Sequence, residues 1–357
     1  MAFLSDGWLA RRKSKESSGH DRVIDTVPEC PYHHQGLWIA RSSDTRSSIW
    51  RMSTNMIPII DTHQHLWDLS RLSLPWIKGL ELMERSYIMA DYLKASADTG
   101  IAASIYMEVD VKTGLRDREI QDVTEHCSRP DILMKGIVIS GDPDSLEFDS
   151  YLDRHSGNEF IKGVRRVLHV DEARPGHCVT PHFVDGVKEL GRRRLLFSIC
   201  MRPSELHDAI DLAKQCPDTV FVLDHCGNAD PYVVNGQRDP GSGPGESDSW
   251  YWHTRQGWID AITELGLQPN VVCKISGIVA RVREGWSAET LAPTIDACLD
   301  AFGSERVIFG GDWPVCLNSA SLPEWVGAFR EVLSRRDVAF QHHAMHANAE
   351  RIYGVSL

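Results

Sequence analysis

The sequence predicts an α/β protein, a distorted (β/α)8 barrel in which eight parallel strands alternate with helices. From residue 57 to the C-terminus, short apolar or β-branched runs alternate with amphipathic stretches. The runs are nearly continuous in apolar residues, as in a parallel sheet that helices cover. Several runs end in a residue that can ionise or bind a metal. This is the pattern of a barrel whose active site lies at the carboxyl ends of its strands.

In each repeat the strand comes before the helix. The expected strands are the segments 57–61, 103–109, 133–140, 161–168, 195–201, 220–224, 271–276 and 307–311. Helical periodicity marks the stretches 115–128, 145–154, 181–193, 204–215, 254–265, 288–302 and 322–335. Ser204 and Ser287 stand at expected helix N-caps. A doubly wound open sheet would alternate similarly. No G-x-G-x-x-G follows the first strand, so the usual reason to prefer a dinucleotide-binding sheet is missing.

Composition limits the kinds of partner. The 357 residues carry a net charge of −12, which argues against a nucleic-acid or anionic-membrane surface. No apolar run is long enough for a membrane helix, and no secretory signal is evident. The nine cysteines are scattered without C-x-x-C pairs. We therefore expect buried, reduced thiols in a cytoplasmic protein and no zinc–thiolate site.

Two regions depart from the repeat. Residues 1–55 are rich in Ser, Arg and His and show no sustained period, so we expect a disordered or loosely attached extension before a barrel at 56–357. The loops at 169–180 and 225–254 are long and follow the fourth and sixth strands. In a barrel, such loops lie at the active-site face.

The first strand leads into "IIDTHQHLWD". His63 and His65 are two residues apart on an extended segment, so their side chains point to the same side. Two imidazoles at a barrel mouth are a common way to hold a divalent metal. A pair of hydrogen-bonded core histidines is the alternative. Asp61 lies deeper in the strand and is expected to support His63.

Three further strand ends carry candidate groups. Asp312 follows the eighth strand in "VIFGGDWPVC" and is expected to be a metal ligand, a general base toward water, or both, unless it merely caps the next turn. His225 follows the sixth strand and could polarise a carbonyl or stabilise an oxyanion. Glu108, after the second strand, is a candidate third metal ligand or a carboxylate that orients a histidine.

Basic and aromatic residues at the same face are candidates for substrate binding. Arg165 and Arg166 are adjacent, so one should face the barrel interior, where a guanidinium suits carboxylates or hydroxyls. Surface salt bridges are the alternative for each arginine. The complete set of substrate-binding candidates is Arg165, Arg166, Arg202, Lys274 and Trp67.

Taken together, "IIDTHQHLWD", "FIKGVRRVLH", "FVLDHCGNADP", "VVCKISGIV" and "VIFGGDWPVC" resemble the amidohydrolase superfamily. The resemblance is to its amidohydrolase-2 branch of sugar-acid lactonases, such as L-rhamnono- and L-fucono-lactonases and 2-pyrone-4,6-dicarboxylate lactonase. It runs from about residue 57 to the C-terminal "NAERIYGV". It implies a distorted (β/α)8 barrel that hydrolyses a lactone ester.

The resemblance also implies roles. His63 and His65 match the family's first-strand H-x-H, His225 its sixth-strand histidine and Asp312 its eighth-strand aspartate. The fifth strand, "FSICMRP", lacks the histidine that the wider superfamily often uses as a ligand. This departure favours a single divalent ion, zinc or manganese, over a binuclear centre. Some relatives look metal-independent, so the need for metal stays open.

The resulting hypothesis is that Asp312 activates water against a lactone carbonyl. The rivals are a metal-dependent decarboxylase of an aromatic or muconate acid, an amide or cyclic-imide hydrolase, and a catalytically inactive barrel that only binds ligands. Retention of His63, His65, His225 and Asp312 together argues against the last.

Overall fold

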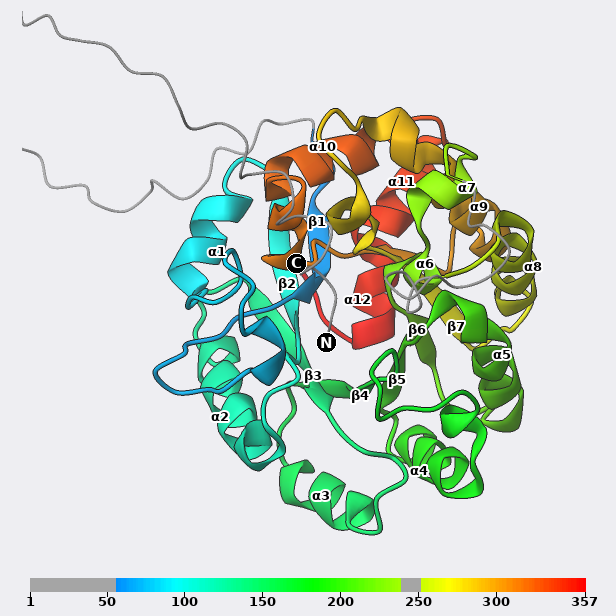
Figure 1. The fold of residues 1–357 in the computed structure, drawn as a ribbon. Coiled ribbons are helices and arrows are strands. Elements are labelled where there is room, and N and C mark those ends of the chain that lie inside the picture. The colour runs from blue at the N-terminus through cyan, green and yellow to red at the C-terminus, as the bar shows by residue number, and fades with distance from the viewer. Residues whose placement is uncertain (1–55, 239–251) are drawn as a thin grey trace, which may run out of the picture. The chain divides into compact units, whose positions relative to one another are not determined.

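Eight parallel strands form the centre of the molecule (Figure 1). This is a computed structural model, and it describes residues 56–238 and 252–357. Each strand pairs with the next in chain order, so the topology is that of the predicted (β/α)8 barrel. The strands are β1 (Ile59–Gln64), β2 (Ile101–Met107), β3 (Met134–Ser140), β4 (Ile161–Val167), β5 (Leu196–Cys200), β6 (Phe221–Leu223), β7 (Val271–Ile275) and β8 (Val307–Phe309).

The barrel closes between the first strand and the segment that follows the last. The Asp312 amide donates to the His63 carbonyl at 2.8 Å, and the His65 amide donates to the Trp313 carbonyl at 2.8 Å. Gln64 and Trp313 form a parallel bridge. Closure therefore joins two segments about as far apart as the barrel sequence allows, and it does so at the predicted catalytic residues.

Helices surround the strands (Figure 1). All seven predicted helices are present, with ends shifted by a few residues at most: α2 (Arg116–Cys127), α3 (Phe148–His155), α4 (Pro181–Arg192), α5 (Leu206–Gln215), α8 (Arg255–Gly266), α9 (Ala288–Phe302) and α10 (Leu322–Leu333). In the described residues, sequence periodicity missed five further α-helices, none longer than eight residues: α1 (Met89–Ser96), α6 (His225–Asn228), α7 (Pro231–Val234), α11 (Val338–His342) and α12 (Asn348–Tyr353).

The core has two layers. Inside the barrel, alternate strand residues such as Ile60, Ile105 and Ile308 pack together, and Ala349 and Tyr353 of α12 join them. A larger apolar layer lies between the strands and the outer helices. The interior is thus filled with apolar side chains except where the polar site lies.

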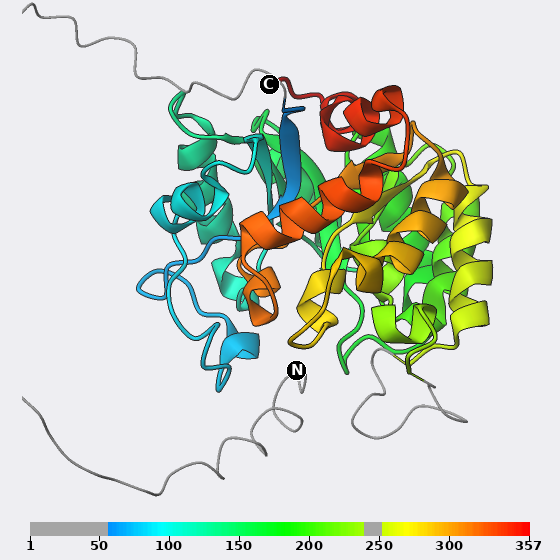
Figure 2. The same cartoon turned by 90° about the horizontal axis from the view of Figure 1, so that it is seen from above.

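Helix α10 fixes the closing strands from outside, and Figure 2 shows it crossing the barrel wall beside β1. The Trp325 indole donates to the Gly310 carbonyl at 3.0 Å, and the Arg330 guanidinium donates to the Ile57 carbonyl at 2.8 Å. These bonds hold the end of β8 and the start of β1.

Two expectations concern segments that are not described. The predicted extension at 1–55 lies outside the described residues, as does the part of the 225–254 loop from 239 to 251. Among the described helices, none has the length and hydropathy needed to cross a membrane.

Candidate active site

His63, His65 and Asp312 meet at the carboxyl end of the barrel. The Nε2 atoms of the two histidines are 3.1 Å apart. Asp312 Oδ1 lies 3.4 Å from His65 Nε2 and 3.7 Å from His63 Nε2. All three residues are buried. Two imidazoles and a carboxylate, which the sequence places at strand ends, thus lie with one donor atom each within 3.7 Å of the others.

The tautomer of His65 follows from its second nitrogen. His65 Nδ1 lies 2.9 Å from the Met107 carbonyl oxygen. A carbonyl oxygen can only accept, so Nδ1 carries the proton and donates it. In neutral His65 the lone pair is then on Nε2, which faces His63 and Asp312. This is the arrangement that orients a histidine as a metal ligand.

Asp61 holds the first strand in place and does not join the donors. Its Oδ1 accepts from the backbone amides of His63 at 3.0 Å and Gly311 at 2.7 Å, and its Oδ2 accepts from the Tyr92 hydroxyl at 2.8 Å. The pairing of β1 with β2 shifts register between Asp61 and Gln64. Asp61 therefore positions His63 through the backbone, which is the supporting role expected for it.

His225 reaches the same site from a strained turn. His225, Cys226, Gly227 and Asn228 of α6 all have positive φ, at 57°, 53°, 66° and 61°. A left-handed conformation costs roughly 1–2 kcal/mol for each residue other than glycine. Such strain collects at functional sites, where the surroundings enforce it. Asp312, with φ of 52°, is strained in the same way.

The next strand holds the His225 ring in position. Ser276 Oγ lies 3.0 Å from His225 Nδ1 and accepts from the His225 amide at 3.2 Å. A Cβ on Gly277 would lie 2.2 Å from His225 Nδ1, so this position has no room for a side chain. Ser276 and Gly277 were not among the predicted site residues. Their signal was weak, because "ISG" after an apolar strand is an ordinary strand ending.

Burial keeps the central imidazoles neutral. Burial lowers the pKa of His63 well below its ordinary value, and nearby Lys274, His65 and Arg165 lower it further. Burial likewise lowers the pKa of His225 well below its ordinary value. Neutral imidazoles offer lone pairs, so these residues are ready to bind a cation or to accept a hydrogen bond.

Arg165 is the arginine of the site, and it forms a buried ion pair with Glu108. Arg165 Nε donates to Glu108 Oε1 at 2.6 Å, and its Nη2 donates to the Glu108 carbonyl at 2.8 Å. The remaining nitrogen, Nη1, lies 3.4 Å from His63 Nε2. Burial alone would lower the pKa of Arg165, but the negative groups around it, Glu108 first and Asp224 among them, together with the hydrogen bond to Glu108, outweigh burial and raise it. Arg165 is thus the interior-facing arginine of the predicted pair.

Lys274 and Asp224 form a second buried ion pair, next to the Nδ1 atom of His63. Lys274 Nζ lies 2.9 Å from Asp224 Oδ1 and 3.4 Å from His63 Nδ1, and neither residue is exposed. The sequence placed Lys274 among substrate-binding residues and named Asp224 only as a strand end. The structure pairs these two charges on the Nδ1 side of His63, away from Asp312. Both charges lie close to the His63 ring, and the charge of Lys274 contributes to lowering the pKa of His63.

The donors fit a single divalent ion. For a tetrahedral zinc with bonds of about 2.1 Å, neighbouring donors lie about 3.4 Å apart. The three separations among His63, His65 and Asp312 scatter around that value. Donor atoms of His63, His225 and Asp312 also lie within 4.8 Å of one another. Glu108, the predicted further ligand, instead binds Arg165 and accepts from the Asp110 amide at 2.6 Å, so it lies outside this donor group.

Three other predicted residues are not brought into the site. Arg166 faces outward and pairs with Asp142 at 3.1 Å. Arg202 donates to the Val170 and Ala173 carbonyls and so braces the loop after β4. Trp67 is buried in an aromatic cluster, with its indole donating to the Arg85 carbonyl at 2.6 Å. Sequence spacing could not distinguish these positions from those that face inward.

The fold and the site together define a (β/α)8 barrel that carries a His/Asp centre suited to a metal ion. The family model described as amidohydrolase matches residues 60–355. The chain therefore belongs to the amidohydrolase family.

Relatives of known name lie at modest identity. An L-fucono-1,5-lactonase from Burkholderia multivorans is 28% identical over 74% of this chain and 85% of its own length. An L-rhamnono-gamma-lactonase from Scheffersomyces stipitis is 23% identical over 72% of this chain and 85% of its own length. The crystal structure of an amidohydrolase from Burkholderia multivorans with bound zinc matches with a TM-score of 0.70, at 25% identity, over 84% of this chain and all of the other.

Proposed function

We propose that the protein hydrolyses the lactone ester of a small sugar acid, of the L-fuconolactone or L-rhamnonolactone type. The observation that supports this best is the position of the Asp312 carboxylate, 3.4 Å from His65 and 3.7 Å from His63, at the carboxyl ends of the strands. A carboxylate in this position is suited to accept a proton from water. The lactonase names of two relatives support the choice of an ester as the bond that is broken.

The proposed reaction has two proton transfers. Asp312 takes a proton from water while the water oxygen forms a bond to the lactone carbonyl carbon. The ring C–O bond then breaks, and the protonated Asp312 returns the proton to the departing alkoxide. The products are the open hydroxy acid and the starting enzyme, so the atoms and charges balance apart from ionisation of the new carboxyl group.

Negative charge develops on the carbonyl oxygen as water attacks. When bound by His63, His65 and Asp312, a zinc or manganese ion would supply Lewis-acid stabilisation of this charge. The chain also offers its own donor, because Nη1 of Arg165 is the guanidinium nitrogen that does not bind Glu108. Its position beside His63 suits it to bind the carbonyl oxygen or a neighbouring sugar hydroxyl.

The cysteines support a location inside the cell. All eight cysteines in the described part of the chain are free thiols. Disulfides persist mainly in oxidising compartments, so free thiols support a cytoplasmic location. We accordingly propose a cytoplasmic enzyme of sugar-acid catabolism.

The test is a screen of five- and six-membered sugar-acid lactones with a pH indicator, on protein of known metal content. We expect at least one lactone to be opened, and the Asp312→Asn variant to lose about 10²–10⁴-fold in kcat/KM, the range of a general base. Asp131→Asn, at an exposed ion pair with Arg129, is the matched control and should retain full activity.

Two results would count against the proposal. Near-normal lactone hydrolysis by Asp312→Asn would remove Asp312 as the base. Release of carbon dioxide from an aromatic or muconate acid, with no lactone opened, would assign the same barrel to decarboxylation.

A further inference from the structure

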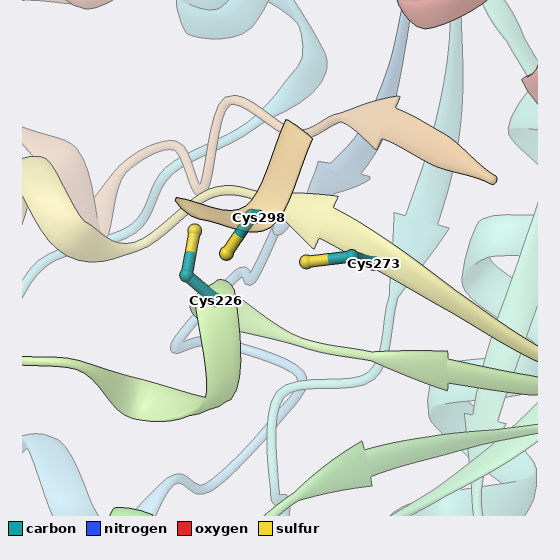
Figure 3. Close-up of side chains that lie close together, drawn as sticks. All are labelled: Cys226, Cys273 and Cys298. Atoms are coloured by element: carbon teal, nitrogen blue, oxygen red, sulfur yellow. The ribbon is translucent and has the colours of Figure 1, made fainter. Parts of the chain in front are cut away.

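Three cysteine side chains, Cys226, Cys273 and Cys298, lie close together with their sulfur atoms near one another (Figure 3). Cys226 lies in α6, Cys273 in β7 and Cys298 in α9. Their sulfur atoms all lie within 4.8 Å of one another, and none of the three residues is exposed. The sequence presented these cysteines as unrelated, since long intervals separate them. Folding alone brings the three thiols together.

The number of donors restricts what the cluster could bind. In the described residues, no histidine or carboxylate joins the three sulfurs within the same distance. Structural zinc sites are almost always four-coordinate, so zinc would be left one ligand short. An element that forms three bonds to sulfur matches the donor set better. Trivalent arsenic does so, with a pyramidal arrangement that needs three thiols on one side.

The net charge of the bound site also favours trivalent arsenic over a metal cation. Zinc bound by three thiolates would leave a net negative charge, and a monovalent soft cation would leave a larger one. A buried charge without a partner is costly. Trivalent arsenic bonded to three cysteine sulfurs is neutral, so its adduct suits a site with no exposure to water.

We propose that Cys226, Cys273 and Cys298 form a binding site for trivalent arsenic, taken up as arsenous acid. Three As–O bonds and three S–H bonds break, three As–S bonds form, and each thiol proton leaves with a hydroxyl group as water. No oxidation or reduction is involved. Cys226 directly follows His225 in the chain, but none of the three sulfurs belongs to the proposed hydrolytic site, so this proposal does not depend on the proposed hydrolysis.

The structure also predicts how such binding behaves. The sulfurs are buried, so arsenous acid must enter through a local opening of the fold, and binding should be slow. Once bound, arsenic would join α6, β7 and α9. The folded chain holds the three thiols together and the unfolded chain does not, so arsenic should bind the folded state more tightly and the melting temperature should rise.

The test uses native mass spectrometry of the full chain, reduced with a phosphine because a thiol reductant would compete for arsenic. After incubation with sodium arsenite, we expect a mass increase of one arsenic atom less three hydrogens. Each As–S bond removes one thiol hydrogen, so this mass gives the number of As–S bonds directly. Cys298→Ala should lose this adduct and the rise in melting temperature. Cys216→Ala, a matched change at a buried cysteine outside the cluster, should keep the adduct and the stabilisation.

Several outcomes would overturn the proposal. One is the absence of an adduct on folded wild-type protein after prolonged incubation. Another is an adduct that keeps a hydroxyl group and has lost two hydrogens, which would mean a two-thiol site. Equal arsenic binding by Cys298→Ala would place the arsenic elsewhere. Zinc retained by the same three cysteines would contradict the argument from charge. The wild-type bond count needs no variant, so it stands even where a substitution prevents folding.

Discussion

At the scale of single residues, the site depends on residues that their neighbours hold in one orientation. The His65 proton is fixed by the Met107 carbonyl, and Arg165 is held by two bonds to Glu108. His225 and Asp312 are held in left-handed conformations. These restrictions turn particular atoms toward the centre of the site: Nε2 of His65 and Nη1 of Arg165 both lie close to His63 Nε2. Preorganisation of this kind is what makes electrostatic stabilisation of a developing charge effective.

Gly277 is the residue whose substitution should best reveal this dependence. In Gly277→Ala the added Cβ would meet the His225 ring at 2.2 Å, in a backbone conformation with φ of 68°. The ring must shift, and we expect a loss of stability of about 1–3 kcal/mol with a fall in kcat. Thermal unfolding and lactone kinetics measure the two effects. Gly114→Ala, where nothing lies within 4 Å, is the control. Wild-type kcat in Gly277→Ala would show that His225 has no part in the reaction.

At the scale of elements, α2 buries a carboxyl group behind the Arg165–Glu108 pair. Glu119 Oε1 accepts from the Tyr106 hydroxyl and from the Val109 amide, each at 2.8 Å. Burial, and next the charge of Glu108, raises the pKa of Glu119 to about 8. The folded protein therefore keeps a proton that the unfolded chain releases near the ordinary value of 4.5. Folding stability should fall as the pH rises from about 4.5 to about 8, and level off above that.

Glu119→Gln should remove this pH dependence. The amide keeps the acceptor for Tyr106 and Val109 and cannot ionise. From pH 6 to pH 9, the free energy of unfolding of the variant should rise relative to that of wild type by about 1–3 kcal/mol, measured by urea unfolding at each pH. Glu125→Gln, on the same helix, controls for the loss of a negative charge. An equal difference at both pH values would show that Glu119 is already ionised in the folded protein.

At the scale of the whole molecule, the metal-type donors lie where the barrel closes. His63 and His65 belong to the first strand and its end, and Asp312 follows the last. An ion bound by all three would reinforce a junction that rests on a few backbone hydrogen bonds. Binding to the folded state alone adds stability by mass action, about 2.7 kcal/mol at a hundredfold excess over Kd.

Chelation should therefore lower stability and activity together. Dialysis against a chelator should reduce the melting temperature and lactone hydrolysis, and zinc or manganese should restore both. In Asp312→Asn the melting temperature should respond much less to the chelator, since a ligand is missing. Full activity in protein shown by elemental analysis to contain no metal would establish a metal-independent hydrolase.

The sequence by itself determined the elements and the chemistry at their ends. Hydrophobic runs and helical periodicity located eight strands and seven helices, because burial on both faces of a parallel sheet imposes nearly continuous apolar strands. His63, His65, His225 and Asp312 were identified as chemical groups placed after strands, together with the interior role of one of two adjacent arginines. Short helices such as α6 were missed, because four residues are too few to show a period.

Tertiary structure alone decided which of these groups meet. Closure of the barrel places Asp312 beside His63, and no local pattern encodes a backbone bond between the first strand and the segment after the last. Side-chain direction at strand ends assigned Glu108 to Arg165, Lys274 to Asp224 and Trp67 to an aromatic cluster. The three buried cysteines are the clearest case, since their spacing in the sequence predicts nothing. Local sequence sets what a segment can form, but long-range packing decides which side chains share a site.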